Sequence, residues 1–300
     1  MMQPASHWSF PYAYPYPVSR HAFEAENYSL AYRWVGAPDQ PVAVLIHGLG
    51  SYMRAWDPVL PVLTEHFRCL VVDLPFYGHS HGRYRPLSMS AFGASIFKLL
   101  DALGVDGRVT LIGHSMGGQI GLQMTLDDPQ RVDRLFLVAP AGLETFTQPE
   151  ADRILEFYQP ELLAKISEAG VLQNFRRCFY KLPASAQFMV DDRLTLIADT
   201  PQFMLFLEQY CHCLKAMLEA PIYDDLPSIA QPIGIFFGLD DLFIPSPLLH
   251  PDWDLKAFVE QTAEGLNHPF LYFATSAGHF PHWDRPDSFQ KSLSDFLFSA

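Results

Sequence analysis

A serine lies between two glycines at residues 113–117, where the sequence reads Gly-His-Ser-Met-Gly. The apolar run 108–112 precedes this segment and a helical pattern follows it. A G-x-S-x-G pattern between a strand and a helix predicts a nucleophile elbow, a sharp turn that exposes a serine hydroxyl at the end of a sheet. Gly113 and Gly117 permit the close approach of strand and helix that such a strained turn requires. Ser115 is therefore the candidate nucleophile, and a chance match in a glycine-rich loop is the alternative.

A serine hydroxyl is a weak nucleophile at neutral pH, so it needs a base within hydrogen-bond reach and an acid that orients the base. The chain order that accompanies a nucleophile elbow is serine, then aspartate or glutamate, then histidine. Asp240 and Asp241 follow the apolar run 233–237, and His279 follows the run 269–273. The sequence thus carries the three chemical groups of a serine hydrolase in the expected order.

Acyl transfer also needs an oxyanion hole, in which two backbone N–H groups point to the oxygen where negative charge develops. The residue after the nucleophile supplies one donor, which is Met116 here. The loop after the run 42–46 is expected to supply the other, and it reads His-Gly-Leu-Gly at residues 47–50.

The elements that must position these groups alternate between strands and helices. Apolar runs at 42–46, 69–73, 108–112 and 131–139 are separated by helical patterns. This rhythm predicts βαβ units, a mostly parallel sheet and right-handed crossovers. A hairpin at 20–35 precedes the runs. Further helices are expected at 56–67, 88–103, 116–128, 255–264 and 286–298.

The rhythm is interrupted between residues 143 and 226, where no strand-like run occurs. Helical patterns are expected at 149–169, 171–180, 186–198 and 201–220. The last of them has one apolar face, which favours packing on the main domain and leaves room for a few side chains to line a pocket. We interpret 143–226 as an inserted helical cap, 20–142 and 227–300 as the core domain, and 1–19 as an N-terminal arm.

Composition limits the function. The 300 residues include 49% hydrophobic and 18% charged side chains, which is typical of a folded globular chain. A net charge of −13 argues against nucleic-acid binding. Four cysteines form no disulfide framework, and the Cys-His-Cys segment 211–213 lacks a second ligand pair at zinc spacing, so no metal or cofactor is expected.

The N-terminal segment 1–18 is rich in proline and tyrosine and lacks the features of a secretory signal. No apolar run approaches membrane-spanning length. We expect a cytoplasmic protein, monomeric or homodimeric, whose opening residues form a mobile or surface-lying arm.

Several of these segments together resemble the α/β-hydrolase superfamily, in its capped serine-hydrolase branch. The resemblance covers about residues 20–298. The segments that carry it are 47–50 with Trp56 downstream, 73–80, 113–118, 238–245 and 278–281. It implies an α/β-hydrolase fold, with a mostly parallel central sheet flanked by helices and an inserted helical cap.

The resemblance also implies roles for individual residues. The family's acid lies three residues after a strand-ending glycine and four before a proline, which is Asp241, with Asp240 as a turn carboxylate and Glu144 as a third option. His279 occupies the position of the base, and Leu49 that of the second oxyanion donor. Substrate contacts are expected, on weaker grounds, from aromatic side chains in the cap and in the motif loops: Phe76, Phe206, Tyr210 and Phe280.

A serine nucleophile excludes the branches that attack with aspartate, the epoxide hydrolases and haloalkane dehalogenases. The resemblance implies a carboxylesterase-like enzyme of class EC 3.1.1 that hydrolyses a small to mid-sized, mainly apolar ester through an acyl-enzyme. One alternative is a carbon–carbon bond hydrolase of ring-cleavage products, which segment 278–284 resembles, although loop 48–52 lacks the Gly-Pro-Gly pattern of those enzymes. Another is a non-catalytic binding or receptor module on the same fold.

Overall fold

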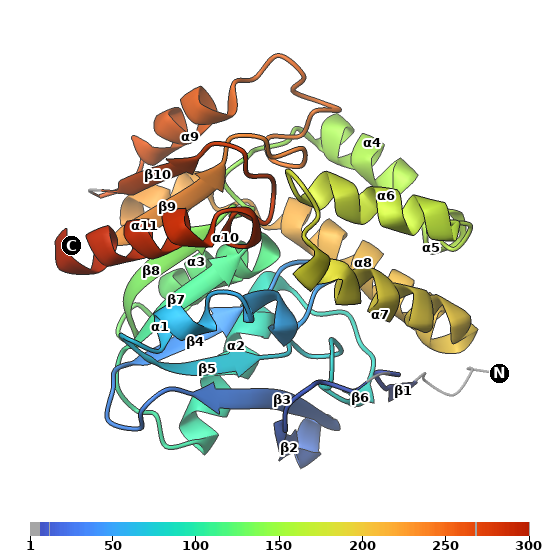
Figure 1. Cartoon of the computed structure of the whole chain (residues 1–300), viewed down its shortest axis with the longest axis horizontal. Coiled ribbons are helices and arrows are strands. Elements are labelled where there is room, and N and C mark those ends of the chain that lie inside the picture. Colours follow the sequence, from blue (N-terminus) through green and yellow to red (C-terminus); the bar gives the residue numbers. More distant parts are fainter. Residues whose placement is uncertain (1–6, 12, 268, 300) are drawn as a thin grey trace.

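The computed structural model describes residues 7–11, 13–267 and 269–299. Its centre is a sheet whose described strands run in the order β1-β6-β3-β5-β4-β7-β8-β9-β10, with β2 paired to β3 (Figure 1). The strands are β1 (His7–Trp8), β2 (Ser19–Phe23), β3 (Tyr28–Val35), β4 (Val42–Ile46), β5 (Arg68–Val72), β6 (Gly82–Arg83), β7 (Val109–His114), β8 (Val132–Val138), β9 (Ile233–Gly238) and β10 (Phe270–Ala274).

In the order of the sheet, β5, β4, β7, β8, β9 and β10 pair in parallel. The pairs that involve β1, β2, β3 or β6 are antiparallel. The mostly parallel sheet predicted from the alternating pattern is confirmed, as is the hairpin of β2 and β3. The continuous apolar runs follow from burial on both faces of the sheet. In β4, for example, Val44 and Ile46 lie in one buried cluster while Ala43 and Leu45 lie in the other.

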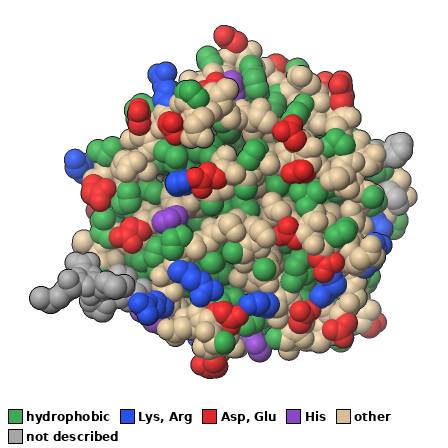
Figure 2. All heavy atoms as spheres, turned by 180° about the vertical axis from the view of Figure 1, so that it is seen from behind, with side chains coloured by type: hydrophobic (Ala, Val, Ile, Leu, Met, Phe, Trp, Pro, Cys, Tyr) green, Lys and Arg blue, Asp and Glu red, His purple; other side chains and the backbone are tan. Residues whose placement is uncertain are grey.

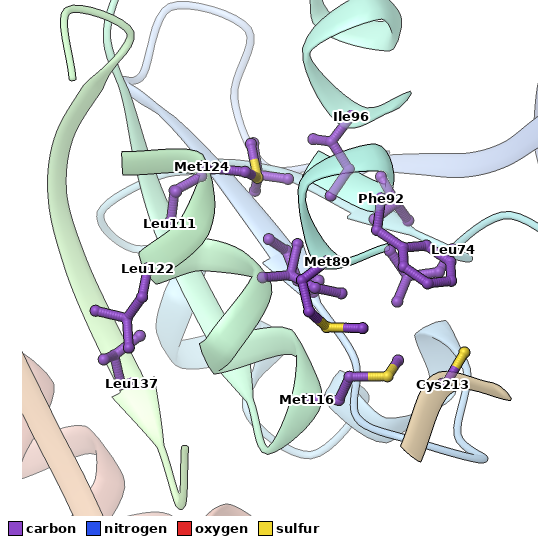
Figure 3. Packing of buried hydrophobic residues seen from close by; sticks show 14 of the residues in the cluster. Leu74, Met89, Phe92, Ile96, Leu111, Met116, Leu122, Met124, Leu137 and Cys213 are labelled. Carbon is purple, nitrogen blue, oxygen red and sulfur yellow. The ribbon is translucent and has the colours of Figure 1, made fainter. Parts of the chain in front are cut away.

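Helices cover both faces of this sheet. The cluster on one face includes side chains from α2 (Met89–Ala102), α3 (Met116–Asp127) and α9 (Leu255–Ala263). The cluster on the other face includes α1 (Leu60–Leu63) and α11 (Pro286–Ser299). Figure 3 shows Met89 and Phe92 of α2, Met116 and Met124 of α3 and Leu111 of β7 within the first of these clusters. The three-layer arrangement holds the strand ends, and therefore the loops that follow them, in fixed positions.

Proline changes two of the predicted helices. The helix expected at 56–67 is a 3₁₀ turn, Met53–Trp56, followed by the single turn of α1, because Pro58 removes a backbone donor between them. Pro61 lies in the first turn of α1, where proline is tolerated. The helix expected at 149–169 divides into α4 (Gln148–Phe157) and α5 (Pro160–Leu163). Gln159 is extended there, which is the conformation favoured before a proline.

The helical insertion between β8 and β9 contains α4 and α5, followed by α6 (Glu168–Cys178), α7 (Gln187–Ala198) and α8 (Thr200–Glu219). Figure 1 shows these helices together beyond one end of the central strands. The apolar face expected on α8 is buried at Phe203, Phe206 and Leu207. Cys213 belongs to the same buried cluster as Met116, so the insertion packs directly on the core (Figure 3).

The expected N-terminal arm, mobile or surface-lying, packs on the core in the part that the structure describes. Strand β1 pairs with β6, and the Trp8 indole is only 1% exposed and donates a hydrogen bond to Gly78 O (3.1 Å). The buried Tyr14 hydroxyl donates to Asp73 Oδ2 (2.9 Å). Burial of these aromatic side chains holds the segment on the core. Residues 1–6 and 12 of the predicted arm lie outside the described residues.

None of the described helices combines the length and the apolar composition needed to cross a bilayer. Acidic and basic side chains are interspersed over the face shown in Figure 2, which is opposite to the view of Figure 1. The net charge of −13 is therefore not gathered into one acidic patch on that face.

Candidate active site

Ser115 lies in the turn between β7 and α3, as the elbow pattern predicts. Its φ of 53° is in the left-handed region, which is strained for a residue other than glycine. The strain is accommodated by close packing at the flanking glycines. A Cβ atom on Gly117 would lie 2.1 Å from Ile46 O, and one on Gly113 would lie 2.4 Å from Gly117 O. Helix α3 can therefore approach β4 and β7 only with glycine at both positions.

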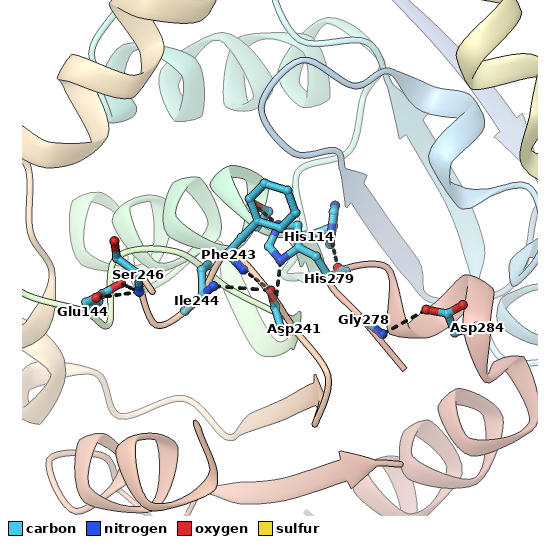
Figure 4. A network of polar contacts seen from close by, with 10 residues as sticks. His114, Glu144, Asp241, Phe243, Ile244, Ser246, Gly278, His279 and Asp284 are labelled. Carbon is cyan, nitrogen blue, oxygen red and sulfur yellow. Dashed lines mark hydrogen bonds and ion pairs between the residues drawn. The ribbon is translucent and has the colours of Figure 1, made fainter. Parts of the chain in front are cut away.

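The structure brings Ser115, His279 and Asp241 together, although they are far apart in the sequence. Ser115 Oγ is 3.0 Å from His279 Nε2. His279 Nδ1 is 2.7 Å from Asp241 Oδ2 (Figure 4). Asp241 Oδ1 accepts hydrogen bonds from the backbone N–H groups of Phe243 (2.8 Å) and Ile244 (3.3 Å). The carboxylate is completely buried and fixed by three donors, so it can orient the imidazole.

The two other acids considered from the sequence have different partners. Asp240 is exposed, and its Oδ2 accepts a hydrogen bond from Ala277 N (3.3 Å), which is a turn contact. Glu144 accepts hydrogen bonds from Ser246 N (2.8 Å) and from His250 Nδ1 (2.5 Å), and burial raises the pKa of its carboxyl. Among the described residues, only Asp241 contacts the His279 ring by a carboxylate hydrogen bond.

Three further histidines hold loops around the site. His114 Nε2 donates to the backbone carbonyl of His279 (2.8 Å), and burial lowers the pKa of His114 well below its usual value. His282 Nε2 donates to Ala55 O (3.0 Å), and burial lowers its pKa to about 3. His47 Nε2 accepts a hydrogen bond from Leu74 N (3.1 Å), and burial lowers its pKa to about 4. These rings are neutral at neutral pH and serve as fixed donors or acceptors.

The two expected oxyanion donors both adjoin the serine. The N–H of Met116 is the first in α3, where a helix provides no acceptor of its own. Loop 47–50 lies against the elbow, because a Cβ atom on Gly48 would lie 3.0 Å from Ser115 Cβ. Leu49 follows Gly48 directly, so its backbone is adjacent to Ser115. The two segments that carry the expected donors therefore both lie beside Ser115.

Three of the four predicted substrate contacts lie near this site. The Phe280 ring is 4.4 Å from the His114 ring. Phe206 and Tyr210 of α8 lie against loop 47–50, since a Cβ atom on Gly50 would lie 3.5 Å from Phe206 and 3.0 Å from Tyr210.

Phe76 is placed differently from the other three. It is buried in the core, with its ring 6.2 Å from Tyr28 and 5.6 Å from Tyr84. This packing gives no support to a substrate contact by Phe76. Its position in a motif loop led to the prediction, and a motif loop does not fix the direction of a side chain.

Sequence analysis missed two side chains beside the site. Arg193 Nη2 of α7 donates to Gly50 O (2.8 Å), and its guanidinium lies 4.2 Å from the Phe206 ring. The Phe243 ring is 5.2 Å from the His279 ring. No pattern in the sequence distinguishes Arg193 from the solvent-facing arginines elsewhere in the helical insertion. Phe243 could have been found from its place two residues after the predicted acid.

The described residues contain no group of three or more His, Cys, Asp or Glu side chains arranged to hold a metal ion. In the Cys-His-Cys segment, Cys213 is buried and Cys211 is half-buried.

Similar sequences belong to one family. A sequence profile described as alpha/beta hydrolase fold matches residues 41–191. An uncharacterized protein of Mycobacterium bovis is 35% identical over 299 residues, covering 90% of this chain and 79% of that protein. A 2-hydroxy-6-oxononadienedioate/2-hydroxy-6-oxononatrienedioate hydrolase of Cupriavidus pinatubonensis is 26% identical over 267 residues, covering 85% of this chain and 86% of that enzyme.

Solved structures show the same fold. An esterase of Thermogutta terrifontis superposes with a TM-score of 0.73 at 19% identity, covering 95% of this chain and 99% of that one. An enol-lactonase of Burkholderia xenovorans LB400 gives a TM-score of 0.70 at 23% identity, covering 94% and 100%. Because the profile spans half of the chain and the mycobacterial relative aligns over most of it, the chain belongs to the alpha/beta hydrolase fold family.

Proposed function

We propose that the protein is a serine hydrolase that cleaves an ester, or a related acyl bond, through an acyl-enzyme. The observation that carries this proposal is the continuous hydrogen-bonded series Asp241–His279–Ser115, with the serine on a strained elbow. This arrangement meets the geometric requirement for nucleophile activation, which is a base within about 3 Å of the hydroxyl and an acid that fixes the base. Family membership supports hydrolysis but leaves the bond open.

In the proposed reaction, His279 Nε2 takes the proton of the Ser115 hydroxyl while Oγ attacks the carbonyl carbon. The carbonyl oxygen becomes an oxyanion, which the backbone N–H groups of Met116 and Leu49 stabilise. Collapse of this intermediate breaks the bond to the alcohol, which leaves with the proton from His279. Water then repeats the sequence on the acyl-enzyme, with His279 again acting as base, and Asp241 orients the imidazole throughout.

We further propose that residues 143–226 act as a cap that selects a small to mid-sized, mainly apolar substrate. Ser115 is 7% exposed, so a substrate must enter a largely enclosed site, and α8 of the insertion lies against loop 47–50 beside it. The side chains that the insertion brings close to loop 47–50 are Phe206 and Tyr210, which favour apolar groups. Arg193, which lies over Phe206, adds a positive charge beside these rings.

A carbon–carbon bond hydrolase is the second candidate, because a relative with that printed activity aligns over 85% of this chain. The same serine, histidine and backbone donors could act on a vinylogous 1,5-diketone in place of an ester. The two candidates therefore differ in substrate and not in the residues that react.

The test is turnover of a p-nitrophenyl ester series of increasing acyl length, beside a lactone, a thioester and a vinylogous 1,5-diketone. We expect ester hydrolysis that Ser115→Ala abolishes and that the exposed Ser90→Ala leaves unchanged. A fluorescent organophosphonate should label the wild type and Ser90→Ala but not Ser115→Ala. Preferential cleavage of the diketone would support the second candidate. If the folded wild type neither turns over any of these substrates nor takes the label, the hydrolase proposal fails.

A further inference from the structure

The helical insertion meets the loop of the candidate base where residues 178–181 lie against residues 278–280. The N–H of Phe280 donates to Cys178 O (3.0 Å). A Cβ atom on Gly278 would lie 2.9 Å from the backbone of Phe179 and Tyr180, so the two chains touch backbone to backbone. The rings of Phe179 and Phe280 stack beside this contact at 5.0 Å.

A single carboxylate joins the two segments. Asp284 ends the short helix α10 (Pro281–Asp284), and its Oδ2 accepts hydrogen bonds from Gly278 N (2.9 Å) and Tyr180 N (2.8 Å). Its Oδ1 is 3.4 Å from Lys181 N, which is a longer contact. The side chain is half-buried, so these backbone donors replace much of the water that a carboxylate would otherwise bind. Figure 4 shows Asp284 directed at Gly278 from the side opposite to Asp241.

The backbone around His279 is thus held from both ends. Asp284 binds the N–H of the residue before it, and His114 donates to the carbonyl of His279 itself (2.8 Å). These two contacts fix the peptide groups that determine where the imidazole lies relative to Ser115. Because Asp284 also accepts a hydrogen bond from Tyr180 N, it connects the helical insertion to the backbone that precedes His279.

We propose that Asp284 is a positioning residue that couples the helical insertion to His279. The inference rests on the proposed function, in which His279 is the base. Because Asp284 supports the base and touches no substrate, its loss should lower kcat and leave KM nearly unchanged. Because the insertion is fastened at residues 178–181, this side of the cap stays with the core when substrate enters.

The first test compares Asp284→Ala with Asp284→Asn. Both short hydrogen bonds end on Oδ2, so an asparagine oxygen can accept both and only the 3.4 Å contact is lost. We expect Asp284→Ala to lower kcat for a short p-nitrophenyl ester about 10-fold to 100-fold, with KM within about 3-fold, since misplacement of a reacting group by about 1 Å has effects of that order. Asp284→Asn should stay within about 3-fold of the wild type, because the buried donors remain paired.

The matched control is Asp287→Ala, an exposed aspartate in the first turn of α11. Phosphonylation by a small organophosphonate should slow in parallel with kcat for Asp284→Ala and stay unchanged for Asp287→Ala, because this reaction uses the same serine and base. If folded Asp284→Ala reacts at the wild-type rate, or if Asp284→Asn loses as much as Asp284→Ala, the inference is wrong. Inactivity of the wild type itself would instead refute the proposed function.

The second variant carries the α-hydroxy acid analogue of tyrosine at position 180, so that an ester oxygen replaces the N–H that the insertion donates to Asp284 and the Tyr180 side chain is kept. Gly278 stays bonded to Asp284. We expect a loss of about 3-fold to 10-fold in kcat, in line with the loss of one charge-assisted hydrogen bond. An unchanged kcat would show that Asp284 supports the histidine loop without involving the insertion, and the coupling would be refuted. This variant also tests the coupling if Asp284→Ala does not fold.

Discussion

Gly48→Ala is the sharpest test of the oxyanion hole, because it adds one methyl group beside the nucleophile. The new Cβ would lie 3.0 Å from both Ser115 Cβ and His114 Nδ1, and 3.3 Å from His114 O. Contacts this short require a shift of a few tenths of an ångström. Ser115 is fixed in its strained turn, and the buried His114 ring is hydrogen-bonded to His279 O. Loop 47–50 must therefore move, and the N–H of Leu49 moves with it.

The expected fall in kcat follows from the transition-state stabilisation that one oxyanion donor supplies. Removing an oxyanion donor outright costs about 3–4 kcal/mol of transition-state stabilisation. A displaced donor is weakened and not lost, so we expect kcat to fall about 10-fold to 30-fold, or about 1.4–2 kcal/mol. KM should change little, because the donor acts on charge that develops only in the transition state.

The assay is steady-state hydrolysis of a short p-nitrophenyl ester, with thermal unfolding as the check on folding. Gly107→Ala is the matched control, since a Cβ atom there would meet no atom within 4 Å. It should retain the wild-type kcat. If Gly48→Ala melts like the wild type and keeps kcat within about 2-fold, our placement of the second donor on loop 47–50 is refuted.

Three further predictions concern stability. Gly121→Ala should raise the free energy of unfolding by about 0.5–1 kcal/mol in urea, because it lies within α3 and its Cβ would meet nothing closer than 3.8 Å. His282 binds a proton in the unfolded chain below pH 6.5 but in the folded protein only near pH 3, so the free energy of unfolding decreases as pH falls from 6.5 to about 3. His282→Gln should make this decrease less steep by about 1.4 kcal/mol per pH unit. Gln202→Leu should speed chymotryptic removal of the N-terminal arm, because Gln202 bonds Ser9 N (3.0 Å) and His7 O (3.1 Å).

Each of these has an outcome that contradicts it. A destabilised Gly121→Ala would mean that α3 is packed more tightly than its 3.8 Å nearest contact implies. Equal slopes of stability against pH for His282→Gln and the wild type would show that the folded ring takes up a proton as readily as the unfolded one. An unchanged cleavage rate for Gln202→Leu would show that the remaining contacts of the arm, among them those of Trp8 and Tyr14, are enough to hold it.

Local features of the sequence predicted most of the framework. The alternation of apolar runs and helical patterns follows from burial on both faces of a parallel sheet, and the strands β4, β5, β7, β8 and β9 lie within two residues of the predicted runs. The order of serine, aspartate and histidine is likewise readable along the chain, because each follows the end of a strand. The helices predicted at 56–67 and 149–169 were wrong because proline interrupts both, at Pro58 and Pro160. Both prolines are visible in the sequence, but the prediction followed the spacing of apolar residues and gave them no weight.

What only the tertiary structure decided are the contacts between distant segments. Hydrophobic periodicity shows that a side chain is buried but not against what, so it could not place Phe76 in the core or Trp8 beneath Gly78. Which carboxylate contacts His279 depends on how the loop after β9 lies relative to the loop after β10. Local secondary-structure propensities carry no information on this arrangement. In the same way, Asp284 reads as a helix-terminal acid until the fold brings Tyr180 and Gly278 to it. The sequence determined which groups were available, and long-range packing determined which of them touch.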